Sequence, residues 1–494
     1  MRDEKSPWPP LYALVVGFFM ITLDMTIVAV ANPAILVDLH TDVNGVIWVT
    51  SAYLLSYVAP LLVAGRMGDR FGPKNLYLAG LVLFTLASLA CGLATGINEL
   101  IVARSFQGLG AAIMTPQTMT VITRTFPPDK RGPALGLWGG VAGLASLVGP
   151  VLGGFLVDSL GWQWIFLVNV PIGLIGLVLA VVLVPSFPPG DKRNDVAGVV
   201  LSSAGVLLLV YGIQQGNSYD WSARTWSIIV CGLVVLVAFV LHQARDGNRA
   251  PLMPLRLFRD RNFVLSNLGI SMMGASITWL TLSGFLYLQT VREMSAIKSG
   301  LVFAPLAVIT GMLAPLMGKL ADRLHPRVVP GLGFALYAIA MLWFAAVLRP
   351  DTSVPMLLIP LTVMGAANSC IWAPLPAIAN RNLPLELAGA GSGVYNTIRQ
   401  TGAVLGSAAT SALITTLMVS KGFHAFAATG SGTGTQLSAQ ARDGLCSAIR
   451  DSAWLPVLLL AVGALASAML ERQASAADGE TSSVDTGLEA GATA

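Results

Sequence analysis

The segment "GRMGDRFGPK" at residues 65–74 recurs later in the chain as "GKLADRLHPR" at residues 318–327. Both copies keep a glycine, a basic residue, an aspartate, an arginine, a proline and a second basic residue at matched places. Each copy lies between two long apolar runs, so chance similarity of two basic loops is the weaker explanation. The recurrence therefore predicts a chain built from two similar halves, arranged as a parallel repeat.

The composition is that of a membrane protein. Of the 494 residues, 55% are hydrophobic and 11% are charged, and the mean hydropathy is +0.72. Soluble domains carry about 25% charged residues. The four cysteines are scattered without the spacing of a metal site or a disulfide framework. We therefore expect an all-α integral membrane protein that holds no metal and no cofactor.

Fourteen apolar runs are long enough to cross the hydrocarbon core of a bilayer as helices. The first is too long for the core of a signal peptide, and no small-residue cleavage site closes it, so we interpret it as a membrane helix. The runs cover residues 11–34, 46–65, 75–96, 99–123, 133–157, 163–184, 196–213, 225–242, 263–290, 297–318, 328–348, 354–379, 388–418 and 452–470.

The repeat groups these runs into domains. We expect a cytoplasmic N-tail, an N-terminal six-helix bundle, an inserted two-helix segment, a C-terminal six-helix bundle and a disordered cytoplasmic tail. The C-terminal bundle includes a flexible external loop with room for a short helix near its end. The boundaries are 1–10, 11–184, 185–262, 263–470 with the loop at 419–451, and 471–494.

The distribution of basic residues predicts the orientation. With a cytoplasmic N-terminus, 20 of the 29 Lys and Arg residues fall in cytoplasmic segments and seven fall on the opposite side. Cytoplasmic loops are enriched in Lys and Arg. We therefore expect both termini in the cytoplasm and the chain in the plasma membrane, which is the inner membrane in bacteria.

One carboxylate lies deep in the first run. Asp24 is the only charged residue of "ITLDMTIVAV" (residues 21–30), and an acid at mid-helix costs about 2.5–3.5 kcal/mol. An acid at this depth can take up and release a proton as its access to water changes. A static, hydrogen-bonded acid in a helix contact is the less favoured alternative.

Two basic residues lie inside helices. Arg104 is about six residues from the external end of its run, or some 9 Å, and Arg399 is about eleven residues into its own run. A buried cation needs a counter-charge or backbone carbonyls. Arg104 is the expected partner of Asp24, whereas Arg399 either stabilises the bundle or faces a substrate cavity.

The repeated loop carries a second functional candidate. Gly65 and Gly68 allow close approach of helices, and Asp69 is placed to cap the start of a facing helix. Positive charge in a cytoplasmic loop explains Arg66 and Lys74 but not Asp69. The loop predicts a cytoplasmic gate that holds the two halves together in one conformation and releases them in another. The gate residues are Gly65, Arg66, Asp69, Arg70, Lys74, Asp322 and Arg323.

Small residues recur in "GLASLVGPVLGGFL" at residues 143–156. They predict a thin helix face with a kink at proline. The segment either forms a bend that shapes the pore and prevents leak, or simply packs closely against a neighbour; the spacing leaves both interpretations open. The residues concerned are Gly143, Gly149, Pro150, Gly153 and Gly154.

Aromatic and polar side chains at helical positions are candidates for a substrate cavity, although most aromatics in membrane helices serve packing or the interface. The candidates are Tyr53, Gln107, Trp138, Trp279, Trp372, Tyr395 and Arg399. The chain has no nucleotide-binding loop, nucleophile elbow or metalloprotease motif. We therefore expect no enzymatic activity, no nucleotide and no nucleic-acid partner.

Taken together, these segments resemble the major facilitator superfamily, and within it the fourteen-helix drug:proton antiporter group. The resemblance covers most of residues 11–470. It rests on "LDMTIVAVANPAI" (23–35), "GRMGDRFGPKNLYLAG" (65–80), "LIVARSFQGLGAAIMTP" (100–116), "GLASLVGPVLGGFL" (143–156), "GWQWIFLVNVPIG" (161–173) and "YNTIRQTGAVLGSA" (395–408).

The resemblance implies alternating access by rocking of the two halves. It implies that Asp24 and Arg104 serve proton coupling and that Asp69 and its neighbours control the cytoplasmic gate. It also implies that the glycine segment around Gly149 marks exporters, here for multidrug efflux driven by the proton motive force, with antibiotic resistance as the outcome.

The chain departs from the group in two respects. The end of the first motif reads "AVANP", with Ala29 where the group commonly has Asn, and the later helices hold no further deep acid. A single deep carboxylate favours one proton per cycle. It also favours neutral, monocationic or lipid-like amphiphilic substrates over dications.

We therefore expect a proton-coupled antiporter that exports hydrophobic or amphipathic compounds, such as drugs and antibiotics, and works as a monomer in the lipid bilayer. The alternatives are a dedicated exporter of lipids or endogenous metabolites, a proton-coupled importer, and a non-transporting scaffold or sensor. The cost of burying Asp24 and Arg104 argues against the last of these.

Overall fold

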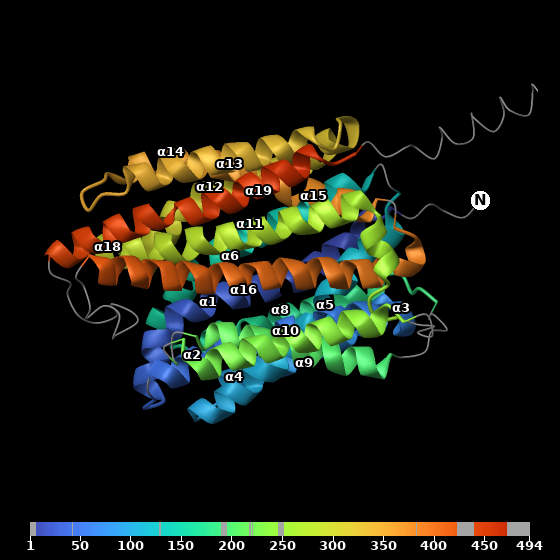
Figure 1. Ribbon diagram of the computed structural model, residues 1–494. Helices are drawn as coiled ribbons and strands as arrows, with labels where there is room; N and C mark the ends of the chain where they lie inside the picture. Colours follow the sequence, from blue (N-terminus) through green and yellow to red (C-terminus); the bar gives the residue numbers. More distant parts are fainter. Residues whose placement is uncertain are drawn as a thin grey trace, which may run out of the picture.

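The computed structural model describes residues 6–41, 43–127, 130–188, 195–216, 219, 221–245, 251–381, 383–421 and 439–471. Within these residues the chain is helical and contains no strand, and the long helices run side by side (Figure 1). The expectation of an all-α fold is confirmed. Most of the external loop and nearly all of the C-terminal tail proposed from the sequence lie outside the described residues.

The N-terminal half begins with the longest helix of this half, in which Asp24 lies at the middle. The second apolar run is broken into α2 and α3, bent by 45°, because Pro60 has no backbone N–H to continue the helix. The helices are α1 (Trp8–Asp38), α2 (Val43–Val58), α3 (Leu61–Phe71), α4 (Pro73–Gly92), α5 (Ile97–Thr125), α6 (Arg131–Leu160), α7 (Trp164–Leu167) and α8 (Asn169–Leu183).

The inserted segment forms a hairpin of α9 (Val196–Gln214) and α10 (Ala223–Gln243). Asp195 caps α9 by accepting from the Gly198 N–H at 2.8 Å, and it also contacts His242 Nε2 at 2.8 Å and Gln243 Nε2 at 2.6 Å. The α9 helix packs against α2 and α3 of the N-terminal half and against the later helix α16 (Ala388–Ser420). The hairpin therefore lies across one side of the junction between the halves.

The C-terminal half repeats the plan of the first. In Figure 1, α12, α13, α14 and α19 lie above α2, α4 and α5 of the N-terminal half. Its elements are η3 (Leu255–Arg259), α11 (Arg261–Leu286), η4 (Tyr287–Val291), α12 (Ala296–Arg323), α13 (Val328–Val347), α14 (Val354–Trp372), α15 (Pro374–Asn380), η5 (Leu385–Leu387), α16 (Ala388–Ser420), α18 (Ala439–Ser452) and α19 (Trp454–Ala468). The α18 helix occupies the end of the external loop, where the sequence left room for one.

Among the described residues, 12 helices are long and apolar enough to cross a membrane, or up to 13 if α2 and α3 form one bent span. The 29-residue α5 is not among them. It is the least apolar of the long helices that we expected to span, because it carries Glu99, Arg104, Gln107 and Arg124. The expected count of fourteen spans stays a prediction.

Candidate functional site

A buried ion pair lies inside the N-terminal half. Arg104 Nη1 of α5 is 2.5 Å from Asp24 Oδ2 of α1, and the two side chains are 1% and 0% exposed. Gln107, one turn along α5, donates from Nε2 to Asp24 Oδ1 at 2.9 Å and accepts from Arg104 Nη1 at 2.7 Å. The structure therefore brings together three residues that the sequence singled out.

Two further polar residues, which sequence reasoning missed, complete this cluster. Asn169 at the start of α8 donates from Nδ2 to Asp24 Oδ1 at 3.3 Å and to Ser88 Oγ at 3.2 Å. Ser88 of α4 also accepts from Gln107 Nε2 at 3.0 Å and donates to the Phe166 carbonyl at 3.0 Å. The only signal for Asn169 was an amide in the apolar segment "GWQWIFLVNVPIG", which also holds Gln163.

The Arg104 guanidinium is held on three sides. Its Nε donates to the Val49 carbonyl of α2 at 3.2 Å, and its Cζ lies 4.2 Å from the Tyr53 ring centre and 5.6 Å from that of Phe166. Breaking a buried pair of this kind by removing one partner destabilises a protein by about 3–5 kcal/mol. The Asp24 carboxylate therefore accepts hydrogen bonds from one charged donor, Arg104, and from two neutral donors, Gln107 and Asn169.

We predict that Asn169→Leu lowers the free energy of unfolding by about 1.5–3 kcal/mol, the usual worth of a hydrogen bond to a charged group. Leu has the same number of side-chain heavy atoms and the same branching at Cγ, but it cannot donate to Asp24. Denaturation in mixed micelles measures the change. Asn75→Leu is the matched control, because Asn75 is exposed on α4 and, among the contacts described, bonds only the Phe71 carbonyl at the end of α3. Equal stability of the two variants would contradict the prediction.

The halves are joined at the end of the bundle that carries the two repeated loops, called here the basic end. Asp69 of α3 accepts from the backbone N–H groups of Gly389 and Ala390, both at 3.1 Å, and so caps the start of α16. Arg124 Nη2 pairs with Asp69 Oδ1 at 2.9 Å, and Arg66 Nη1 lies 3.9 Å from Asp69 Oδ2. We call Gly65, Asp69, Gly389 and Ala390 the latch.

The two glycines of the latch have no room for a side chain. A Cβ added at Gly389 would collide with the Gly65 carbonyl oxygen and lie 2.5 Å from Asp69 Oδ1. The second loop copy repeats the contact on the other side: a Cβ at Gly132 of α6 would lie 2.5 Å from Asp322 Oδ2 and 2.6 Å from the Gly318 carbonyl oxygen. Matched residues of the two loop copies therefore face the starts of α16 and α6.

The other expected gate residues lie around these contacts. Arg70 stacks on the Phe71 ring at 5.0 Å, and Lys74 Nζ donates to the Val181 carbonyl of α8 at 2.8 Å. Arg323 is exposed in the last turn of α12. In addition, Arg131 donates to the Asn380 carbonyl of α15 at 3.4 Å, a link between the halves that the sequence did not indicate.

The glycine segment of α6 packs against both halves. A Cβ at Gly149 would collide with Thr26 Oγ1, and one at Gly153 would lie 2.7 Å from Ile27 Cγ1, both on α1. On the other face, a Cβ at Gly154 would lie 2.7 Å from Ile297 Cγ1 of α12, and one at Gly143 would lie 3.6 Å from the Ala307 carbonyl. The helix continues through Pro150 as one element. These contacts support the close-packing interpretation of the segment.

A group of aromatic residues and Arg399 lies in the interior. Phe18 stacks on Trp138 at 4.3 Å, and the neighbouring Gly139 faces Trp372 of α14. The Arg399 guanidinium lies 5.5 Å from the Trp372 ring centre. Tyr395 lies one turn before Arg399 and is 1% exposed.

Three of the cavity candidates lie elsewhere. Trp279 donates from its indole to Ser452 Oγ at 3.0 Å, so its polar edge points to the junction of α18 and α19 within the C-terminal half. Tyr53 packs on Arg104 and on the Tyr57 ring at 5.9 Å. Tyr53 and Gln107 thus belong to the ion-pair cluster rather than to the aromatic group.

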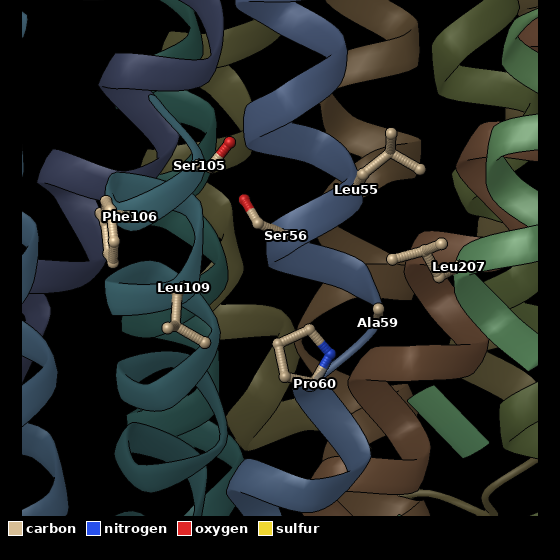
Figure 2. Close-up of a pocket in the computed structure, with 8 residues that line it drawn as sticks. All are labelled: Leu55, Ser56, Ala59, Pro60, Ser105, Phe106, Leu109 and Leu207. Atoms are coloured by element: carbon tan, nitrogen blue, oxygen red, sulfur yellow. The ribbon is translucent and has the colours of Figure 1, made fainter. Parts of the chain in front are cut away.

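An apolar pocket of about 300 Å³ lies on the outer side of the α2–α5 contact (Figure 2). Its walls come from α2, α5 and α9, and the exposed side chains of Phe106 and Leu207 stand at its edge. The hydroxyls of Ser56 and Ser105 bond carbonyls of their own helices, which leaves the lining apolar. The lining residues are Leu55, Ser56, Ala59, Pro60, Ser105, Phe106, Leu109 and Leu207.

Two repeated helical halves, joined at one end by a charged latch and holding a buried ion pair, define a multi-pass membrane transporter. Residues 14–407 match the family model of the Major Facilitator Superfamily. The chain belongs to this superfamily, and as a member it is a transporter of small substrates and not an enzyme.

Relatives within the superfamily include exporters. The chain is 48% identical over 471 residues to an uncharacterised MFS-type transporter of Mycobacterium tuberculosis, covering 94% of this chain and 81% of the relative. It is 35% identical to the tetracenomycin C resistance and export protein of Streptomyces glaucescens (81% and 75% covered) and 30% identical to the multidrug export protein EmrB of Haemophilus influenzae (83% and 82%).

Solved structures share the fold. The proton:xylose symporter XylE superposes with a TM-score of 0.63 at 14% identity, covering 93% of this chain and 94% of that one. At this level of identity the likeness concerns the fold alone.

Proposed function

We propose that the chain is a proton-coupled antiporter that exports hydrophobic or amphipathic compounds by alternating access. The observation that carries the proposal is the Asp24–Arg104 pair, an acid buried completely in a transporter half and held by donors from Arg104, Gln107 and Asn169. The names of the multidrug and tetracenomycin export relatives support export of such compounds.

The latch supports the alternating-access part of the proposal. The hydrogen bonds and close contacts described between α16 and the N-terminal half fall between Gly389 and Asn396, at the basic end. With the basic end in the cytoplasm, as the distribution of Lys and Arg favours, this conformation is closed to the cytoplasm. Rupture of the latch would then open the transporter to its cytoplasmic substrate, in a bacterial inner membrane with both termini inside.

A dedicated exporter of lipids or of a metabolite with a long apolar part is the second candidate. The apolar pocket between α2, α5 and α9 favours it, because this pocket opens on the outer face of the bundle, where a lipid chain would reach it (Figure 2). Transfer of fluorescent lipid between leaflets of proteoliposomes tests this candidate.

The test of the main proposal is efflux of three hydrophobic dyes, one neutral, one monocationic and one monoanionic, from cells that express the protein. We expect at least one dye to be expelled, and collapse of the proton gradient by a protonophore to stop its efflux. Cells that carry the empty vector are the control. Efflux that persists after the collapse, or no efflux of any dye together with active lipid transfer, would reject proton-coupled drug export.

A further inference from the structure

Arg399 lies directly beyond the region where α16 meets the N-terminal half. Within that region, Ser392 Oγ is 3.5 Å from Thr120 Oγ1, and Asn396 Nδ2 is 3.9 Å from Met119 Sδ. Arg399 follows Asn396 by one turn and is half-buried. Its position places a cation one turn beyond the contact between Asn396 and Met119.

This cation has no acid partner among the described residues. The ion pairs found there do not include Arg399. Its Nη2 donates to the neutral Asn396 Oδ1 at 3.2 Å, its ring contact is with Trp372 at 5.5 Å, and its Nε is buried without a partner. An ion pair is the usual way to offset the burial of a guanidinium.

The neighbours of Arg399 also lack acceptors. The indole N–H of Trp372 and the hydroxyl of Tyr395 are buried without a hydrogen-bond partner, and so is the indole N–H of Trp138. These residues are 9%, 1% and 0% exposed, respectively. Guanidinium and indole groups can only donate hydrogen bonds, so this group offers donors and positive charge with no matching anion.

We propose that Arg399, Trp372 and Tyr395 bind the anionic head of an amphipathic substrate, such as a carboxylate, with its apolar part against Trp138 and Phe18. A planar guanidinium suits two-point binding of a carboxylate or phosphate. The inference rests on the proposed transport function and names its substrate class. It differs from the sequence expectation of neutral, monocationic or lipid-like substrates, because Asp24 is paired with Arg104 and offers no free acid to a cation.

The sign of the substrate charge has a consequence for energetics. Export of a monoanion in exchange for one entering proton moves two positive charges inward per cycle. An inside-negative membrane potential then drives both movements. Export of a neutral compound would move one charge, and export of a monocation would move none.

The test uses the purified full-length chain in detergent and three dansyl probes whose fluorescence reports binding. These are dansyl-leucine (monoanion), its methyl ester (neutral) and dansylcadaverine (monocation). We expect the acid to bind more tightly than the ester, and Arg399→Gln to weaken binding of the acid about 10- to 100-fold while binding of the ester changes little. Arg399→Lys keeps the charge but not the planar guanidinium, so its affinity for the acid should lie between those of the wild type and Arg399→Gln.

Arg224→Gln is the matched control, because Arg224 is exposed on α10, and it should bind all three probes as the wild type does. If Arg399→Gln does not fold, the affinity of the wild type for the acid relative to the ester still tests the anion site. Equal affinity for acid, ester and cation, or an equal loss of all three in Arg399→Gln, would overturn the inference.

Two further measurements complete the test. One distinguishes a lipid headgroup from a free organic acid, and the other distinguishes failure of the anion site from failure of the antiport mechanism. Competition by phosphatidylglycerol but not phosphatidylcholine in the micelles would identify a lipid headgroup as the anion, whereas no competition would identify a free organic acid. Because binding is measured without a proton gradient, acid-selective binding without gradient-driven efflux would reject the antiport mechanism alone. Gradient-driven efflux of neutral dye without acid preference would reject only the anion site.

Discussion

The Asp24→Asn variant is expected to hold no substrate gradient across the membrane. Asn keeps the shape of the side chain and can still accept from Arg104, but it cannot take up a proton. At about 150 mV the entry of one proton is worth about 3.4 kcal/mol. With 1.36 kcal/mol per tenfold, the wild type can hold a neutral substrate at a gradient of up to a few hundred-fold.

The measurement is the steady-state ratio of a neutral dye inside and outside proteoliposomes with an imposed potential. Asp38→Asn is the matched control, since Asp38 lies at the exposed end of the same helix and bonds Trp162 Nε1 at 3.1 Å. Downhill exchange should survive in Asp24→Asn, which separates loss of coupling from loss of folding. A gradient in Asp24→Asn equal to that of the wild type would make Asp24 a structural residue.

The Gly389→Ala variant is expected to open the basic end and to stop transport. The added Cβ would meet the Gly65 carbonyl oxygen and Asp69 Oδ1, so α3 and α16 must separate. Overpacking of this kind costs about 1–3 kcal/mol. Because the cost falls on the closed conformation, it should shift the equilibrium toward the open one by about 5- to 150-fold.

Cysteine labelling from the basic end measures this shift. A cysteine at Ser392, which is 0% exposed beside Thr120, should react faster by the same factor in Gly389→Ala, in a background without the four native cysteines. Gly391→Ala is the matched control, because its Cβ would meet only the flexible Leu383 side chain and the Asn380 amide, both within the C-terminal half. Unchanged labelling would mean that the latch does not close the transporter.

Part of the site could be predicted from the sequence for a simple reason. Asp24 and Arg104 both lie in apolar runs, and two opposite charges buried in one small bundle are strongly driven to pair. Asp69 could be expected at a helix start because a carboxylate accepts well from the free N–H groups of the first turn. The break between α2 and α3 at Pro60 was not predicted, and other helices continue through Pro116 and Pro150.

Other parts could not be predicted. Asn169 is 145 residues from Asp24 along the chain, and a single amide in an apolar run does not tell which helix it faces. Trp279 and Trp372 look equivalent as aromatic residues in apolar runs, yet one bonds Ser452 and the other lies under Arg399. Helix rotation decides this difference, and rotation is set by packing against every neighbour at once.

The sequence by itself determined that the chain is helical, lies in a membrane and consists of two similar halves. Each of these properties depends on residues that are close together in the sequence. The length of an apolar run decides whether it can cross the membrane, and in lipid the backbone must satisfy its own hydrogen bonds as a helix. Only the tertiary structure decided that Asp69 meets Gly389, 320 residues away, and that Arg399 is left among donors without an acid. Contacts of this kind depend on how rigid helices fit together, which no local pattern of residues fixes.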